Sequence, residues 1–372
     1  MTITATGAIS FSDLRTEFVG GSSAISLGDL YRGGSNIRKK ASNNFATNLA
    51  ASVPTGGAID MADFYSTAKA FRVTYGTGAA APNYQNQDAG VLFGDDFAVD
   101  YPKEIVIGSG VELGATSTSE EALEVPSGGA GTITITNNGT LSGYGGAAGS
   151  NGGDAFEAAT TCTFVNNGIV RAGGGGGGAG GAGGSGSYTS YTPYYDSLYY
   201  KWGQYQGGQC GYAVFVRFGQ YPSLAAIKYT YVIISSFTYG GYTWQRGSAS
   251  STAFQRYCDD SYHYTTGYSV RRGSSASSSG GSGGAGGVGA GYGVSAGSGS
   301  SGSAGGTNAG TGGAGGAGGD FGAAGSSGST GASGNSGSGS AGSSGGSAGK
   351  YARSSGGTLT FTNNGTVQGN AP

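Results

Sequence analysis

The chain has 372 residues, of which 83 are glycine and only 36% are hydrophobic. Much of it therefore cannot build an ordinary apolar core, and several small units in series are expected. A net charge of -2 and 10% charged residues argue against nucleic acid and anionic membranes as partners.

Targeting signals are not evident. No apolar run approaches the roughly 18 residues of a membrane span, and the N-terminus lacks the basic and apolar regions of a secretory signal. The sequence predicts a protein made in a cytoplasm.

Histidine and cysteine are scarce. His263 is the single histidine, which argues against most zinc sites and most serine or cysteine nucleophile systems. We therefore expect no enzymatic activity, no cofactor and no bound metal. Of the three cysteines, Cys210 and Cys258 could form a disulfide, while free buried thiols are the alternative.

A short motif occurs three times in the first 70 residues, at 8–14, 24–30 and 58–64. Each copy has a serine or aspartate followed three residues later by an aspartate, which resembles a helix capping box. The motif predicts three short helices. Because such helices are not stable alone, we expect them to dock on something, and an extended arm of this kind suits attachment to a larger assembly.

Residues 71–131 show a strand pattern. Short alternating stretches at 71–75, 104–107, 111–113 and 122–125 are separated by Gly, Pro and Ser turns. They predict a small β domain, built as a sandwich or as a stack of β coils.

A second motif also occurs three times. Alternating residues lead into Asn-Asn-Gly at 137–139, 166–168 and 363–365. We interpret each copy as a strand, a tight turn with positive φ and a second strand, hence a β-hairpin. The three hairpins are expected to stack into a β base from which the glycine-rich segments project.

Glycine recurs at every third position from Gly310 to Gly337. The polyproline II backbone has three residues per turn, so this spacing gives a stripe without side chains along which a neighbouring helix can approach. A collagen triple helix is not expected, because it needs abundant proline and no proline lies in 280–349. The tract predicts packed polyglycine II helices, with a turn near Asp320 and Phe321; a disordered linker is the alternative.

Residues 188–272 contain 17 of the 25 tyrosines and both tryptophans. Tyrosine-rich surfaces are typical of binding sites, because the side chain gives large contact area at low entropic cost. The alternative is that these rings fill the core of a small β domain. Strands are expected at 214–218 and 229–234, and loops at 194–202 and 259–264. The candidate receptor-binding residues are Tyr194, Tyr195, Tyr199, Tyr200, Trp202, Tyr239, Tyr242, Trp244, Tyr262, His263 and Tyr264.

Taken together, the phased glycines with an aromatic insert between them resemble the distal tail-fibre adhesins of T-even-type phages. Residues 104–140, including Glu104-Ile105-Val106-Ile107, are similar to a segment of phage tail-tip and central-fibre proteins. The resemblance implies a virion protein that presents receptor-binding loops on polyglycine II helices. The T-even adhesins lack an N-terminal arm like this one.

The expected fold is mainly β with packed polyglycine II helices, a short α-helical N-terminal arm and a Tyr-rich β insert domain. The expected units are 1–70 (virion-attachment arm), 71–131 (small β domain), 132–187 (hairpins and polyglycine II segments), 188–279 (receptor-binding insert), 280–357 (polyglycine II bundle) and 358–372 (C-terminal hairpin). The candidate attachment residues are Ile9, Phe11, Leu14, Ile25, Leu27, Leu30, Ile59, Met61 and Phe64.

The predicted function is that of a phage tail fibre or tail-tip adhesin. Its expected partners are other tail or baseplate proteins and a bacterial receptor, either a glycan or an outer-membrane protein. A homotrimer and a monomeric tip are both compatible with the sequence. The alternatives are a fibre-borne glycan hydrolase, which needs two carboxylates across a cleft, and a polyglycine II ice-binding protein.

Overall fold

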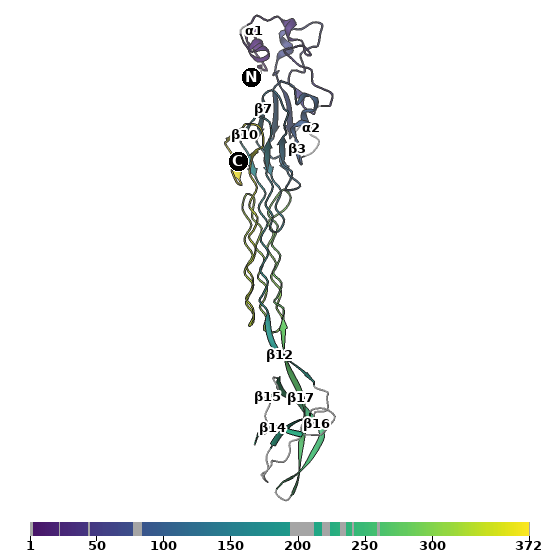
Figure 1. The fold of residues 1–372 in the computed structure, drawn as a ribbon. Helices are drawn as coiled ribbons and strands as arrows, with labels where there is room; N and C mark the ends of the chain where they lie inside the picture. Colours follow the sequence, from purple (N-terminus) through teal and green to yellow (C-terminus); the bar gives the residue numbers. More distant parts are fainter. Residues whose placement is uncertain are drawn as a thin grey trace.

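The computed structural model describes residues 3–21, 23–43, 45–76, 84–193, 212–217, 224–230, 236–239, 242–258 and 261–371. It is elongated, with the N-terminal unit at one end, strands β12 to β17 at the other, and glycine-rich segments between them (Figure 1). The fold is mainly β with a short N-terminal helix, as expected. None of the described helices is long and apolar enough to cross a membrane.

The N-terminal unit contains the three predicted capping boxes, and all three form. Only the first begins an α-helix, α1 (Phe11–Leu14), which continues as a π-helical turn, η1 (Arg15–Val19). The other two open single 3-10 turns, η2 (Leu27–Leu30) and η3 (Met61–Phe64). The prediction of three short helices is therefore confirmed, although two of them are 3-10 helices and not α-helices.

These short elements pack against one another. The last residue of each element, Leu14, Leu30 or Phe64, is fully buried in one shared core. The linking segment adds Ile37 and Val53, also fully buried. The expectation of an extended arm is wrong, because equivalent apolar residues of the three motifs bury each other.

The main body is a parallel β-solenoid in which each inner coil contributes one strand to each of three sheets, whereas the first and last coils contribute to two of them. The first sheet runs β1 (Thr47–Asn48), β2 (Phe71–Tyr75), β4 (Lys103–Ile107), β7 (Ile133–Asn137), β10 (Cys162–Asn166) and β19 (Leu359–Asn363). The second runs β5 (Glu112–Gly114), β8 (Thr140–Ser142), β11 (Ile169–Arg171) and β20 (Thr366–Gln368). The third runs β3 (Gln87–Asp88), β6 (Leu123–Val125), β9 (Phe156–Ala158) and β18 (Arg353–Ser354).

The solenoid core is built from the inward positions of alternating strands. Ile105, Ile135 and Phe164 occupy equivalent places on successive strands and are fully buried. The first coil also carries α2 (Ala89–Phe93), whose Ala89, Leu92 and Phe93 join this core, and the 3-10 turn η4 (Gly94–Asp96) that follows it. Lys103 is buried too, and its Nζ donates to the carbonyls of Val99, Tyr101 and Ala130 (2.7 to 3.0 Å).

The predicted β-hairpins are wrong. The strands on either side of Asn-Asn-Gly belong to different sheets, and each pairs in parallel with the equivalent strand of the next copy. The expected stacking of the three copies is confirmed, but each Asn-Asn-Gly is a corner of a coil.

The expected boundary at 131/132 does not separate domains, because β4 pairs with β7 along its whole length.

Glycine at these corners is required by close packing, not by positive φ, which none of the three turns has. A Cβ at Gly168 would lie 2.1 Å from the carbonyl oxygen of Gly139, and one at Gly365 would lie 2.1 Å from that of Gly168. Successive coils could not stack with any side chain there.

The glycine-rich segments leave the solenoid after β8 and after β11 and form a block of extended chains. Segment 173–185 lies at its centre and is hydrogen-bonded every third residue to each neighbour. The amides of Gly174, Gly177, Gly180 and Gly183 donate to segment 281–290, and those of Gly175, Gly178, Gly181 and Gly184 donate to segment 323–332. The remaining faces accept from segments 310–319 and 340–349.

The ladder from Gly310 folds back on itself, as predicted. The Ala323 amide donates to the Asp320 carbonyl (2.9 Å), and Gly322 has φ 69°. A Cβ at Gly310, Gly313, Gly316 or Gly319 would lie 1.8 to 2.2 Å from a backbone oxygen of the returning segment. The period of three therefore follows from contact, since every third residue faces a neighbouring backbone.

Candidate functional site

The tyrosine-rich insert grows from the far end of the glycine block. β12 (Gly186–Pro193) and β17 (Ser261–Ser278) leave and re-enter the block side by side, paired antiparallel with Gly186 opposite Ser278. β17 continues in a long pairing with β16 (Tyr242–Cys258), which pairs with β15 (Ser236–Tyr239). β13 (Tyr212–Arg217) and β14 (Leu224–Thr230) form a separate pair.

The register divides the described receptor candidates into two sets. Near the block, Tyr239 lies opposite Tyr242, and Trp244 is paired with Phe237 and Arg272. We refer to these as the proximal set.

At the other end of the β16 and β17 pair, Tyr262, His263 and Tyr264 lie opposite Tyr257, Arg256 and Gln255. We refer to these six residues as the distal set. With about 3.3 Å per residue along β17, the two sets lie about 30 Å apart along the ribbon, so they do not form one patch.

The strands and loops predicted for the insert are only partly confirmed. The strand at 214–218 is confirmed over 214–217, where β13 begins two residues earlier than predicted, and the one at 229–234 overlaps β14 only at its start. The loop expected at 259–264 is wrong from Ser261 onward, where β17 begins. Tyr194, Tyr195, Tyr199, Tyr200 and Trp202 lie outside the described residues, and so does Cys210 of the suggested disulfide. The third cysteine, Cys162, is free and buried.

The candidate attachment residues differ in exposure. Leu14, Leu30 and Phe64 are inaccessible to a partner, because they form the core of the N-terminal unit. Five others (Ile9, Ile25, Leu27, Ile59 and Met61) are half-buried against that core. Phe11 points outward with 47% of its surface exposed. Tyr65, also exposed, was not predicted; its hydroxyl donates to the Gly7 carbonyl (2.6 Å).

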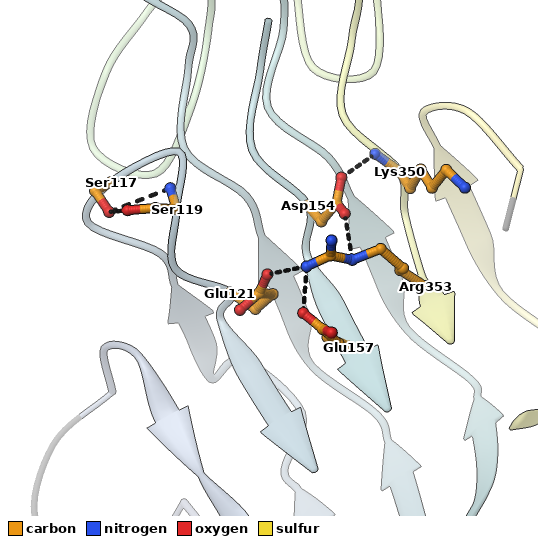
Figure 2. A network of polar contacts seen from close by, with 7 residues as sticks. All are labelled: Ser117, Ser119, Glu121, Asp154, Glu157, Lys350 and Arg353. Atoms are coloured by element: carbon orange, nitrogen blue, oxygen red, sulfur yellow. Dashed lines mark hydrogen bonds and ion pairs between the residues drawn. The ribbon is translucent and has the colours of Figure 1, made fainter. Parts of the chain in front are cut away.

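A charged cluster on the third sheet had no signal in the sequence, because its members are up to 232 residues apart. Arg353 on β18 reaches Glu121 (2.9 Å), Asp154 (3.0 Å) and Glu157 on the neighbouring coils (Figure 2). The other Asp154 oxygen accepts the Lys350 amide (2.7 Å). Burial, followed by the charge of Glu157, raises the pKa of Glu121 to about 7. The cluster fastens the chain returning from the glycine block onto the solenoid.

A cavity of about 480 Å³ lies where β7, β10 and β19 begin. Its described lining consists mostly of glycine and threonine, including Thr132, Thr161 and Thr360, and its one carboxylate is Asp100. Glycoside hydrolysis ordinarily uses two carboxylates that flank the substrate. The cavity does not supply the pair that the hydrolase alternative needs.

A family model described as phage tail fibre adhesin Gp38 matches residues 70–275, more than half of the chain. The chain belongs to this family of adhesins. It is thus a structural, receptor-binding protein of the phage virion, located in the tail. The match covers the solenoid up to β11, the central segment of the glycine block and almost all of the insert.

Comparison with solved structures finds the gp37-gp38 adhesin tip complex of the bacteriophage S16 long tail fibre. The match has 14% sequence identity, a TM-score of 0.30, and covers 86% of this chain and 88% of that chain. A similarity this low transfers no contact of that complex to this adhesin. No curated protein matches the chain.

Proposed function

We propose that this adhesin attaches to another tail protein through its N-terminal unit and binds a bacterial glycan or outer-membrane protein through its insert. The observation that carries the proposal is the position of the insert. Both of its ends are joined to the far end of the glycine block, away from the N-terminal unit (Figure 1). In a tail protein, that end is free to meet a cell.

The glycine-rich segments are proposed to be polyglycine II helices that act as a rigid spacer. Hydrogen bonds at every third residue, in several directions around segment 173–185, support this assignment. Serine hydroxyls support it further where the central segment reaches the surface. The Ala179 and Ala182 amides are satisfied by the Ser343 and Ser340 hydroxyls (2.7 Å each). A block so fully bonded can hold the insert at a fixed distance.

The distal set is proposed as the receptor surface. It carries three tyrosines, a histidine and an arginine, residues that combine large contact area with hydrogen bonding. Tyrosine faces can also stack on sugar rings. The proximal set lies nearer the block and is proposed not to contact the receptor.

Competition for adsorption tests this assignment. The purified adhesin is expected to bind host cells and slow phage adsorption, and Tyr262→Ala with Tyr264→Ala should abolish both effects. Tyr239→Ala with Tyr242→Ala is the matched control and should leave both effects in place if the chain stays folded. If the distal variant competes as well as the unmodified chain, the receptor surface lies elsewhere. Protease treatment or periodate oxidation of the cells distinguishes a protein receptor from a glycan.

Attachment is proposed to use the face of the N-terminal unit that carries Phe11. This side chain has 47% of its surface exposed, and burying that apolar surface against a partner would be favourable. The partner is proposed to be another tail or baseplate protein. Purified virions carrying Phe11→Ser adhesin should show a lower adhesin content by immunoblot, and unchanged content would rule out this contact.

A further inference from the structure

The two ends of the solenoid differ. At the first coil, β1 pairs antiparallel with β2 and joins the solenoid to the N-terminal unit. At the last coil, β19 and β20 are edge strands of their sheets, with no neighbouring strand on the outer side among the described residues.

The last coil has the composition of an inner coil. Residues 358–368 include no charge and no proline, the devices that commonly protect an exposed sheet edge. Leu359, Phe361 and Val367 are only half-buried, although the equivalent Cys162, Phe164 and Val170 one coil earlier are buried. An additional coil would cover them.

An asparagine ladder is open at this edge. Asn137 Nδ2 donates to Asn166 Oδ1 (2.8 Å), and Asn166 Nδ2 donates to Asn363 Oδ1 (2.7 Å). Among the described residues, Asn363 Nδ2 has no acceptor. The edge thus presents one amide donor at the place where a further asparagine would accept it.

The second asparagines form a parallel ladder with the opposite sense. Asn364 Nδ2 donates to Asn167 Oδ1, and Asn167 Nδ2 donates to Asn138 Oδ1, both at 3.0 Å. Here the edge presents the Asn364 Oδ1 acceptor, which has no donor in the described part of the chain. A second Asn-Asn pair in register would complete both ladders.

The backbone of β19 also faces outward on alternate residues. Cys162 donates its amide to the Thr358 carbonyl, and Asn364 donates to the Asn166 carbonyl. Because parallel ladders alternate, the amides and carbonyls of Leu359, Phe361 and Asn363 point away from β10.

Any further Asn-Asn-Gly turn that stacks on this edge must also contain glycine. At both inner steps of the stack, a Cβ on the glycine would lie 2.1 Å from the carbonyl oxygen of the previous glycine. A coil stacked on Gly365 in the same way meets the same constraint.

We propose that the last coil is a docking edge for a strand, Asn-Asn-Gly turn and strand of another protein chain, which runs parallel to β19 and adds a further coil. A second copy of this adhesin has no such segment to offer, because its three copies of the motif are already stacked in its own solenoid. The edge is separate from the receptor surface and from Phe11, so this contact is independent of both.

A peptide that copies residues 131–143 of the adhesin is the probe, because it carries the motif in its native order. Labelled peptide is titrated onto the full-length chain and followed by fluorescence anisotropy, after sedimentation shows the peptide to be monomeric. Saturable binding is expected, with at least about tenfold weaker binding of the Gly139→Ala peptide and of the Asn137→Ala, Asn138→Ala peptide. Amide exchange should slow at Leu359, Phe361 and Asn363.

Four results would overturn the proposal. One is no binding up to about 1 mM peptide. Another is equal binding of the native and Gly139→Ala peptides, and a third is protection at amides other than those of the last coil. Self-association of the adhesin that protects the same amides without peptide would assign the edge to a second copy and would also overturn it.

Discussion

Replacing Gly181 by alanine tests whether the segments of the glycine block are closely packed or form a flexible linker. The new Cβ would lie 1.8 Å from the Ser340 carbonyl oxygen, where ordinary contact begins at 3.4 Å. Segment 340–349 would have to move away, which weakens the bonds from the Ser340 and Ser343 amides to the central segment (2.8 Å each). Two lost backbone bonds at about 1 kcal/mol each, with about 1 to 3 kcal/mol of overpacking, give a destabilisation of about 3 to 5 kcal/mol.

The assay is equilibrium unfolding by denaturant with amide exchange read across segment 173–185. Ala314→Ser is the matched control, because this residue is on the exposed side of its segment and already carries a Cβ. A flexible linker predicts the opposite sign for Gly181→Ala, since alanine restricts the unfolded chain and stabilises by about 0.4 to 1 kcal/mol. A neutral or stabilising result would refute the packed block.

Three further predictions concern the solenoid and the N-terminal unit. The pKa of Glu121 is about 7 in the folded chain and ordinarily 4.5, so the folded chain is most stable below about pH 4.5 and should lose up to about 3 kcal/mol as the pH rises to 7. In urea unfolding at several pH values, Glu121→Gln should flatten this pH dependence, and the control Glu112→Gln should leave it unchanged. Leu14→Ala should lower the stability of the N-terminal unit by about 2 to 5 kcal/mol in thermal unfolding, whereas Phe11→Ser should reduce virion incorporation with little change in stability. Lys103→Met should cost at least about 2 kcal/mol in denaturant unfolding, because three carbonyls lose their donor, and an unchanged midpoint would contradict this role.

The sequence predicted the local features that short-range physics controls. The capping boxes, the strands of the solenoid and the fold-back near Asp320 depend on neighbouring residues and were found where expected. The Asn-Asn-Gly turns were interpreted as hairpins because local pattern does not show whether two strands pair with each other or with distant copies. Position 168 illustrates this limit. Glycine is required there because Gly139 packs against it, and Gly139 is 29 residues away in the chain.

The candidate site was predicted only in outline. Aromatic composition located the insert, but the separation of Tyr239 from Tyr262 depends on the register of a long strand pair. The burial of Leu14, Leu30 and Phe64 follows from their packing on each other, which three separate motifs do not reveal. The ion pairs of Arg353 join coils that the whole glycine block separates along the chain.

The return of the chain to the solenoid also sets an order of folding. The bond between Asn166 and Asn363 closes a span of 197 residues, which corresponds to a loop entropy of about 5 kcal/mol if the intervening chain is unstructured. Ribosomes complete β10 and β11 long before they make β19, so the nascent chain carries open strand edges while the glycine block and the insert are synthesised. Folding the block first brings its two ends together and shortens this search. A chain that terminates inside the insert never covers β10 and is expected to aggregate.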